Sequence, residues 1–257
     1  MISIKTPEEI EIMRQAGRIL AEVMNKIVPK VQRDVSVLEI DELAEKLICQ
    51  TGAEPGFKGY KSGGKIYPAT LCVSVNEQVV HSLPKKETVL KQGDIVGIDC
   101  GVKYQEYYSD MALTVGVGKI SSQAKKLIQV TKKSLDTAIK KIKPGIHLGD
   151  VSWSVQSYVE KNGFSVVRQL SGHGIGKELH EEPSILNYGE KRTGPILKQG
   201  MVLAIEPMVN AGGWKIKTLD DNWTIVTEDG SLSAHFEHTI LVTEKGAEVL
   251  TRLDKRI

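Results

Sequence analysis

Residues 90–99 read LKQGDIVGID, and residues 197–206 read LKQGMVLAIE. The two segments share LKQG, continue as a mostly apolar run and end on a carboxylate, Asp99 in the first and Glu206 in the second. A short apolar and β-branched run entered through a glycine is typical of a buried strand. A carboxylate at the inner end of such a strand is costly unless a cation receives it. The repeat therefore predicts two equivalent strands whose carboxylates face each other across a central cleft and require a metal.

Further features recur in the same order in both halves of the chain. Apolar periodicity and capping residues predict helices over residues 6–28, 36–50, 122–143 and 150–162. His81-Ser-Leu-Pro is echoed by His180-Glu-Glu-Pro, each ahead of one of the repeated strands. Each half thus has, in the same order, a helix, a second helix, a strand with a histidine and a strand with a carboxylate. These four similarities indicate an internal duplication. We therefore predict a single α+β catalytic domain over residues 1–257, with halves of about 1–118 and 119–257 packed about a pseudo-two-fold axis and the cleft on that axis.

The composition narrows the class of protein. The chain has 257 residues, 40% of them hydrophobic, and a formal net charge of +2, which does not favour nucleic acid or an anionic membrane as the main partner. Three cysteines outside any CxxC pair are typical of a reducing compartment. No apolar run approaches the ~20 residues of a membrane span, and the start lacks the apolar core of a signal peptide. We expect a cytoplasmic protein. The lysines of the helix over 122–143 are interpreted as a solvated face, and docking on an anionic surface is the alternative interpretation.

Residues 54–65, EPGFKGYKSGGK, predict a long loop. Alternation over residues 70–80 predicts a strand with a bulge or turn at Asn76-Glu77, which delivers His81 at its end. Residues 102–117 predict a hairpin that carries Asp110. A strand is also expected in LSAHFEHTILV, residues 232–242, around Glu237.

Five residues are candidates for metal chemistry: Asp99, Asp110, His173, Glu206 and Glu237. His173 lies between glycines, which permit close backbone approach. Four converging carboxylates would repel one another, and two divalent cations would balance their charge. Oxygen-dominated ligation with one imidazole suits Mn, Fe, Co or Zn. Two such ions hold a bridging water as hydroxide near neutral pH and polarise a carbonyl, which is hydrolytic chemistry.

His81 and His180, one from each half, are expected to flank the metals, where they could hydrogen-bond an oxyanion or shuttle a proton. On spacing alone, a structural histidine at a strand end is an equally good interpretation of either residue.

The motifs together resemble a known family. The run GHGIG at 172–176 with HEEP at 180–183, IEPM at 205–208, and FEHT at 236–239, with the pair Asp99 and Asp110, is similar to type I methionine aminopeptidases in their short, bacterial form. The resemblance extends over essentially the whole chain. It implies the pita-bread (creatinase/aminopeptidase) fold and removal of the initiator methionine from nascent polypeptides whose second residue is small, by a monomer near the ribosome surface.

The resemblance also implies roles for individual residues. Asp99 would chelate one metal, Asp110 and Glu237 would bridge both, and His173 and Glu206 would hold the other. His81 would lie near the substrate amine or scissile nitrogen and His180 near the oxyanion, with Glu206 as proton carrier. The methionine pocket would comprise Phe57, Tyr60, Cys72, Leu179 and Trp223. Leu179 stands where many relatives carry Phe, and residues 61–65 lengthen the loop beside the pocket.

Two alternatives remain open. An Xaa-Pro peptidase would share the fold and the metal ligands, although such enzymes usually carry an additional amino-terminal domain. A catalytically inactive relative could serve as a binding module, although such proteins usually lack ligands that are all present here.

Overall fold

The computed structural model describes residues 2–253. Its helices form two antiparallel pairs, and capping explains where the first pair begins. Thr6 and Ser36 each accept a backbone hydrogen bond in a capping box that is completed by Glu9 and Glu39. The helical segments are α1 (Pro7–Ile27), the 3₁₀ turn η1 (Val28–Lys30), α2 (Val37–Cys49), α3 (Ser122–Ile139) and α4 (Leu148–Lys161).

Every strand pairing among the described residues is antiparallel. One sheet contains β1 (Glu54–Pro55), β4 (Leu71–Val75), β6 (Ile95–Tyr104) and β7 (Tyr107–Gly116). A second contains β9 (Ser171–Gly174), β10 (Glu181–Leu186), β11 (Val202–Ile205), β16 (His238–Thr243) and β17 (Gly246–Val249). A third sheet contains β8 (Ser165–Val166), β12 (Met208–Asn210) and β15 (Ser233–His235). A fourth contains β5 (Gln78–Val80), β13 (Ile216–Thr218) and β14 (Ile225–Thr227). The last is a hairpin of β2 (Lys61–Ser62) and β3 (Lys65–Ile66).

The two LKQG segments have the same local structure. Gly93 (φ 99°) and Gly200 (φ 86°) both adopt the left-handed conformation that suits glycine, and a strand starts two residues after each. β6 passes through Asp99, whereas β11 ends one residue before Glu206. The predicted pair of equivalent strands is thus present, one in each of the two larger sheets.

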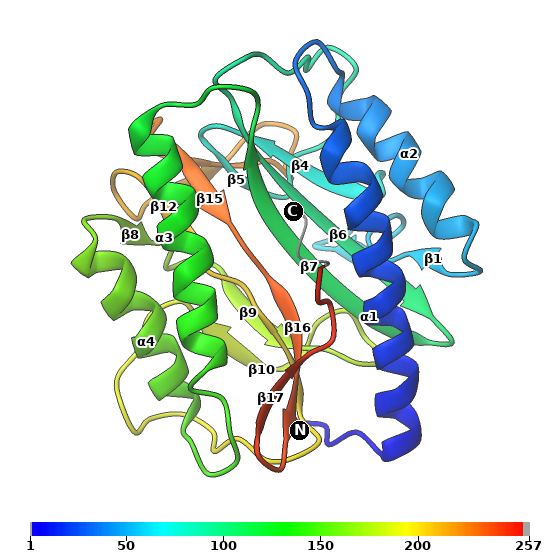
Figure 1. Ribbon diagram of the computed structural model, residues 1–257, viewed down its shortest axis with the longest axis vertical. Coiled ribbons are helices and arrows are strands. Elements are labelled where there is room, and N and C mark those ends of the chain that lie inside the picture. Colours follow the sequence, from blue (N-terminus) through cyan, green and yellow to red (C-terminus); the bar gives the residue numbers. More distant parts are fainter. Residues whose placement is uncertain (1, 254–257) are drawn as a thin grey trace.

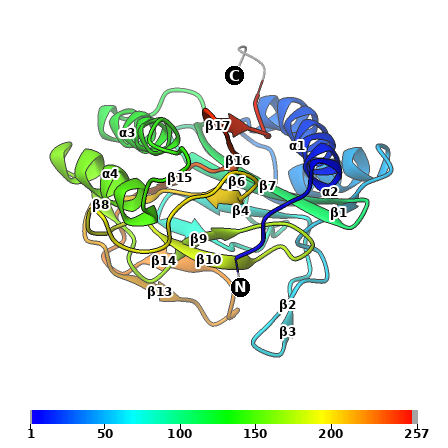
Figure 2. The ribbon, with the colours of Figure 1, turned by 90° about the horizontal axis from the view of Figure 1, so that it is seen from below.

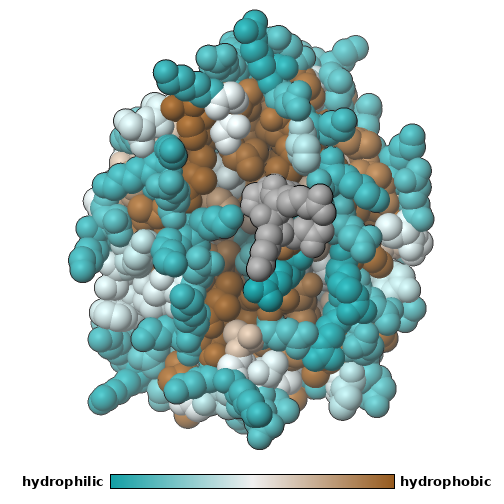
Figure 3. All heavy atoms as spheres, in the orientation of Figure 1, coloured by the Kyte–Doolittle hydropathy of each residue, from teal (hydrophilic) through white to brown (hydrophobic). Residues whose placement is uncertain are grey.

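The helices pack on one side of the sheets (Figures 1 and 2). Apolar side chains from both helix pairs and from both large sheets form one buried cluster, which includes Met24, Ile40, Ile98, Leu127 and Ile240. Viewed from the helix side, the surface over the helices is largely hydrophilic, with apolar residues visible in the gap between α1 and α3 (Figure 3). The β2–β3 hairpin projects from the opposite side (Figure 2). Within residues 2–253, no helix combines the length and apolar character needed to cross a bilayer.

The bulge or turn predicted at Asn76-Glu77 is confirmed, because the strand over 70–80 divides there into β4 and β5. The Asn76 side chain (φ 57°) accepts a hydrogen bond from Ile95 N–H and donates one to Asp94, so that β5 leaves the sheet of β4. The single strand predicted over 232–242 was wrong, because it breaks at Phe236 and Glu237, and β15 and β16 join different sheets.

The expected loop over 54–65 contains β1, which extends the β6 sheet, and most of the β2–β3 hairpin. The hairpin turn is formed by consecutive glycines with positive φ, Gly63 (55°) and Gly64 (77°). The prediction of a loop did not include this hairpin. α3 ends at Ile139 and not at residue 143, and α4 begins at Leu148, two residues early. An antiparallel bridge between His147 and Ile196 fixes the start of α4.

Candidate dimetal active site

The β6–β7 hairpin brings Asp99 and Asp110 to one face of the sheet. Asp99 lies opposite Ala112, and Asp110 lies opposite Gly101, so the two aspartates are diagonal neighbours whose side chains project from the same face. Asp110 is 4% exposed, whereas Asp99 keeps partial exposure.

Glu237 reaches the aspartates because its backbone crosses to β7. Its N–H donates to the Ala112 carbonyl oxygen at 2.8 Å, and Thr239 Oγ1 donates to the Asp110 carbonyl oxygen at 2.7 Å. The interruption between β15 and β16 therefore has a function in the fold: it turns Glu237 toward Asp110.

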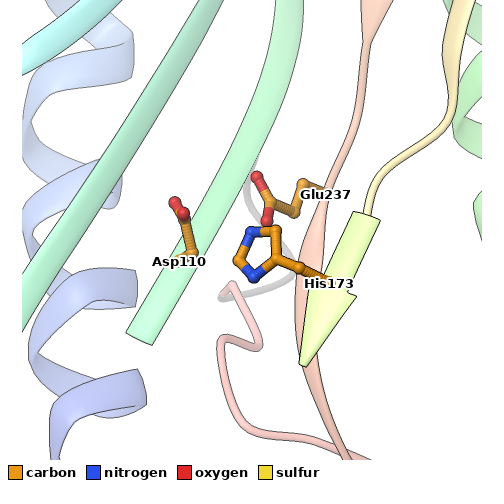
Figure 4. A group of neighbouring side chains, drawn as sticks. All are labelled: Asp110, His173 and Glu237. Carbon is orange, nitrogen blue, oxygen red and sulfur yellow. The ribbon is translucent and has the colours of Figure 1, made fainter. Parts of the chain in front are cut away.

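His173 approaches from β9, on the other large sheet. Its flanking glycines are sterically required, because a Cβ atom on Gly172 would lie 2.4 Å from the Ala204 carbonyl oxygen and one on Gly174 would lie 2.1 Å from that of Glu182. One ligand atom each from Asp110, His173 and Glu237 all lie within 4.8 Å of one another. The three side chains converge on a common space (Figure 4).

Glu206 completes the group next to His173. Its Oε1 is 3.5 Å from His173 Nε2, and its Oε2 is 3.7 Å from His235 Nε2. His235 is 3% exposed. The sequence analysis missed His235, although a histidine two residues before Glu237 in AHFE was a visible signal.

The charges of this cluster are not compensated by the protein. Burial raises the pKa of Asp99 to about 7. Burial, followed by the charges of Glu237 and Asp99, raises the pKa of Asp110 well above its ordinary value. Burial and neighbouring carboxylates likewise raise the pKa of Glu206 and of Glu237. Burial lowers the pKa of His173 to about 3, so this imidazole is neutral and has a lone pair to offer.

These donors fit a divalent metal. Within residues 2–253, none of the four carboxylates forms an ion pair with lysine or arginine. Buried oxygens on Asp99, Asp110 and Glu237 have no hydrogen-bond partner there. A cation would satisfy those oxygens and remove the mutual repulsion, and carboxylates with a neutral imidazole are ligands of Mn, Fe, Co and Zn.

His81 and His180 lie at the same cavity as the five candidate ligands. His81 follows β5 in a left-handed conformation (φ 58°), and burial and the nearby His180 lower its pKa to about 4. The His180 ring centroid is 4.4 Å from that of His173, and its Nδ1 is 2.6 Å from Tyr60 Oη. Both histidines are thus placed beside the candidate metal ligands, one before residue 119 and one after it.

The cavity is about 360 Å³ in volume. All five residues expected in the methionine pocket line it: Phe57, Tyr60, Cys72, Leu179 and Trp223. Further lining residues that the sequence analysis did not assign are Ser62, Tyr67, Thr218, Asn222 and Ile225. Tyr67 is 3% exposed, and its hydroxyl is within hydrogen-bond distance of the Leu71 and Ser82 carbonyl oxygens. An apolar compartment therefore adjoins the carboxylate cluster.

Such a cavity, with buried carboxylates and a neutral imidazole, defines a metal-dependent hydrolase site, and the profile of metallopeptidase family M24 matches residues 11–244. The chain belongs to metallopeptidase family M24, which implies a divalent metal. Within that family, relatives that match nearly the whole chain are methionine aminopeptidases. Methionine aminopeptidase 1 of Bacillus subtilis is 50% identical over 253 residues, which cover 98% of this chain and 100% of the relative.

Solved structures agree. The crystal structure of methionine aminopeptidase from Thermotoga maritima matches with a TM-score of 0.95 and 50% identity. The match covers 98% of this chain and 100% of the Thermotoga maritima chain. A prolidase from Pyrococcus furiosus is more distant, with a TM-score of 0.77 and 25% identity, and this chain covers 66% of it. The expected pita-bread fold is confirmed by these neighbours.

Proposed function

We propose that this chain removes the N-terminal methionine from polypeptides whose second residue is small, using two divalent metal ions. Its family membership and its relatives support a metallo-exopeptidase that releases methionine. The observation that carries the proposal is the junction of two features in one cavity. A cluster of buried, unpartnered carboxylate oxygens adjoins an apolar compartment that could accept a methionine side chain.

We assign the metal ligands as the family resemblance implies. Asp99 would hold one ion, Asp110 and Glu237 would bridge both, and His173 and Glu206 would hold the other. Metal bound there lowers the pKa of a coordinated water and polarises the scissile carbonyl. The nearness of Asp110, His173 and Glu237 to one another supports a shared site for these three residues.

The remaining polar residues would act directly on the substrate. Glu206 has Oε1 3.5 Å from His173 Nε2. It would accept a proton from the attacking water and donate that proton to the leaving amine. His180 would donate a hydrogen bond to the developing oxyanion from Nε2, because its Nδ1 is engaged by the Tyr60 hydroxyl. His81 would contact the scissile nitrogen or the substrate amine.

The methionine side chain would lie against Phe57, Cys72 and Leu179, three buried residues of one apolar cluster. Tyr60 and Trp223 are partly buried and pack against the same cluster, where they would close the compartment. Apolar burial of this kind supplies affinity, and the limited volume restricts the residue that can enter.

The proposal is tested by cleavage of Met-Ala-Ser, Met-Leu-Ser and Ala-Pro-Ser. The protein is stripped with a chelator and assayed before and after addition of Mn, Fe(II), Co or Zn. We expect metal-dependent release of methionine from Met-Ala-Ser alone. Cleavage of Ala-Pro-Ser instead would favour the Xaa-Pro peptidase, and metal binding without any cleavage would favour a binding homologue.

The cellular setting is also proposed. We place the protein in the cytoplasm as a monomer that acts on nascent chains. The three cysteines, Cys49, Cys72 and Cys100, are free, which fits a reducing compartment. Exposed lysines along α3 could meet the anionic ribosome surface. Co-sedimentation with purified ribosomes at low and high salt tests this contact, and size-exclusion chromatography with light scattering tests the monomer.

A further inference from the structure

The β2–β3 hairpin stands at the mouth of the cavity. Ser62 in β2, Thr218 in β13 and Asn222 line the cavity and are exposed, so these residues lie where it opens to solvent. If methionine occupies the apolar compartment, the rest of the peptide must leave past these exposed residues. The hairpin is therefore placed to contact the substrate beyond its second residue.

The register of the hairpin determines which side chains face the cavity. Ser62 pairs with Lys65, and Lys61 pairs with Ile66. Tyr67 N–H donates to the Tyr60 carbonyl oxygen at 2.8 Å, which extends the ladder by one pair. Paired residues share a face of a hairpin, and successive pairs alternate between its faces.

One face of the hairpin thus carries Tyr60, Ser62, Lys65 and Tyr67, and three of these four residues line the cavity. Lys65 is the fourth, next to the turn, and it lies at the outer end of the same face. Lys61 and Ile66 lie on the other face, and Ile66 is 58% exposed. The alternation therefore directs the Lys65 ammonium over the path of the departing peptide.

The charge on Lys65 is available to a ligand. Within the described residues it forms no ion pair, whereas the nearby Lys58 is held by Glu45 at 2.7 Å. Near Asn222, Asp221 is paired with Lys85 at 3.3 Å, and Asp220 is exposed. Glu178 is exposed and lies close enough to Tyr60 to raise the pKa of that phenol after the larger effect of burial. Lys65 is thus the unpaired cation on the cavity-facing side of the hairpin.

We propose that Lys65 is a specificity-determining residue, which contacts an acidic side chain at the third or fourth position of the substrate and thereby favours polypeptides that are acidic after their second residue. The inference rests on the proposed function, because it assumes a peptide anchored by its N-terminal methionine. Since Lys65 is remote from the scissile bond, its contact stabilises bound substrate and transition state alike, and the effect should appear in KM more than in kcat.

The test compares Met-Ala-Glu-Glu-Ser, Met-Ala-Gln-Gln-Ser and Met-Ala-Lys-Lys-Ser with the metal-loaded enzyme at low salt. We expect kcat/KM to be about two- to fivefold higher for the acidic than for the basic peptide, as for one partly solvated ion pair. Lys65→Gln should bring this ratio close to one, and Lys65→Glu should reverse it. Added salt should reduce the preference of the unchanged enzyme.

Lys61→Glu is the matched control, because it makes the same charge change on the opposite face of the same hairpin. The inference is overturned if all three peptides release methionine with ratios that do not respond to Lys65→Gln and Lys65→Glu. It is also overturned if Lys61→Glu changes the ratio as much as Lys65→Glu, since the effect would then be general electrostatics. No release of methionine by the unchanged enzyme from any peptide would instead refute the proposed function.

Discussion

At the scale of single residues, the site is a set of groups that the protein stabilises poorly without metal. Asp110 and Glu237 are 4% and 2% exposed, and each has a buried oxygen without a hydrogen-bond partner within residues 2–253. Burying a charge costs free energy unless a partner compensates it. The metal-free protein should therefore prefer its carboxylates protonated, and this preference is measurable as a dependence of stability on pH.

Asp99 gives the sign of that dependence. Its pKa in the folded protein is about 7, against an ordinary value of 3.8, so the folded state binds the proton more tightly than the unfolded state does. Its contribution to stability is fully present below the unfolded pKa and is lost as the pH rises toward 7. Urea unfolding of metal-free protein at about pH 5 and about pH 7.5 should show a loss on the order of 1–3 kcal/mol, reduced in Asp99→Asn. Equal pH dependence in both proteins would contradict the assignment.

His235 offers a second prediction at this scale. Its Nε2 is buried without a hydrogen-bond partner and lies 3.7 Å from Glu206 Oε2, a distance that could shorten when Glu206 binds metal. Mutation of a group that orients a metal ligand typically lowers metal affinity by about 10–100-fold. His235→Leu should therefore weaken metal binding by roughly tenfold, as measured by calorimetric titration of the stripped protein.

His235→Gln serves as the control for that experiment, because an amide can still donate a hydrogen bond toward Glu206. It should retain most of the affinity that His235→Leu loses. If both variants bind metal as tightly as the unchanged protein, His235 does not orient Glu206.

At the scale of elements, the β6 strand supports both the carboxylate cluster and the apolar compartment beside it. Asp99 belongs to the carboxylate cluster, and two residues further along the strand Gly101 lies against the Phe57 ring. A Cβ atom on Gly101 would lie 2.6 Å from Phe57 Cε1, too close for the ring to keep its place. The absence of a side chain at Gly101 thus sets the position of one wall of the compartment.

Gly101→Ala should push Phe57 toward the cavity. Overpacking of this kind costs about 1–3 kcal/mol, so we expect a fall in kcat/KM for Met-Ala-Ser of roughly tenfold together with lower stability. Gly97→Ala is a matched control on the same strand, because its Cβ atom would meet its nearest neighbour, Thr114 Oγ1, at 3.6 Å. Steady-state kinetics and thermal unfolding of both variants test the prediction, which fails if the two behave alike.

The elements also show what sequence reasoning can recover. The LKQG repeat predicted the strands of Asp99 and Glu206 because an apolar run after a glycine is a local signal. The break at Glu237 was missed because it depends on a hydrogen bond to Ala112, 125 positions away in the chain (237 − 112). The position of His235, two residues before Glu237, was a local signal, but only tertiary packing shows that His235 reaches Glu206. Local patterns thus identified the chemistry, and long-range pairing determined its arrangement.

At the scale of the whole molecule, the site joins the two predicted halves. Asp99 and Asp110 come from the β6–β7 hairpin, whereas His173, Glu206 and Glu237 come from after residue 119. The duplication itself stays a prediction. The distribution of ligands nevertheless means that a metal bound by all five residues would link segments far apart in the sequence and would bind the unfolded chain much more weakly.

Metal removal should therefore lower the stability of the entire chain. A ligand present at 100 times its Kd stabilises the folded state by about 2.7 kcal/mol, which for a chain of this size corresponds to a Tm increase of roughly 5–10 °C. Thermal unfolding with chelator and with added Mn should show that difference near neutral pH. Asp110→Asn replaces a ligand that must ionise to bind metal with a neutral amide, so it should abolish most of the metal-dependent shift and yet match or exceed the Tm of the unchanged protein in chelator. A large Mn-dependent shift retained in Asp110→Asn would place the stabilising ion elsewhere, because the buried carboxylate cluster could not then be its main site.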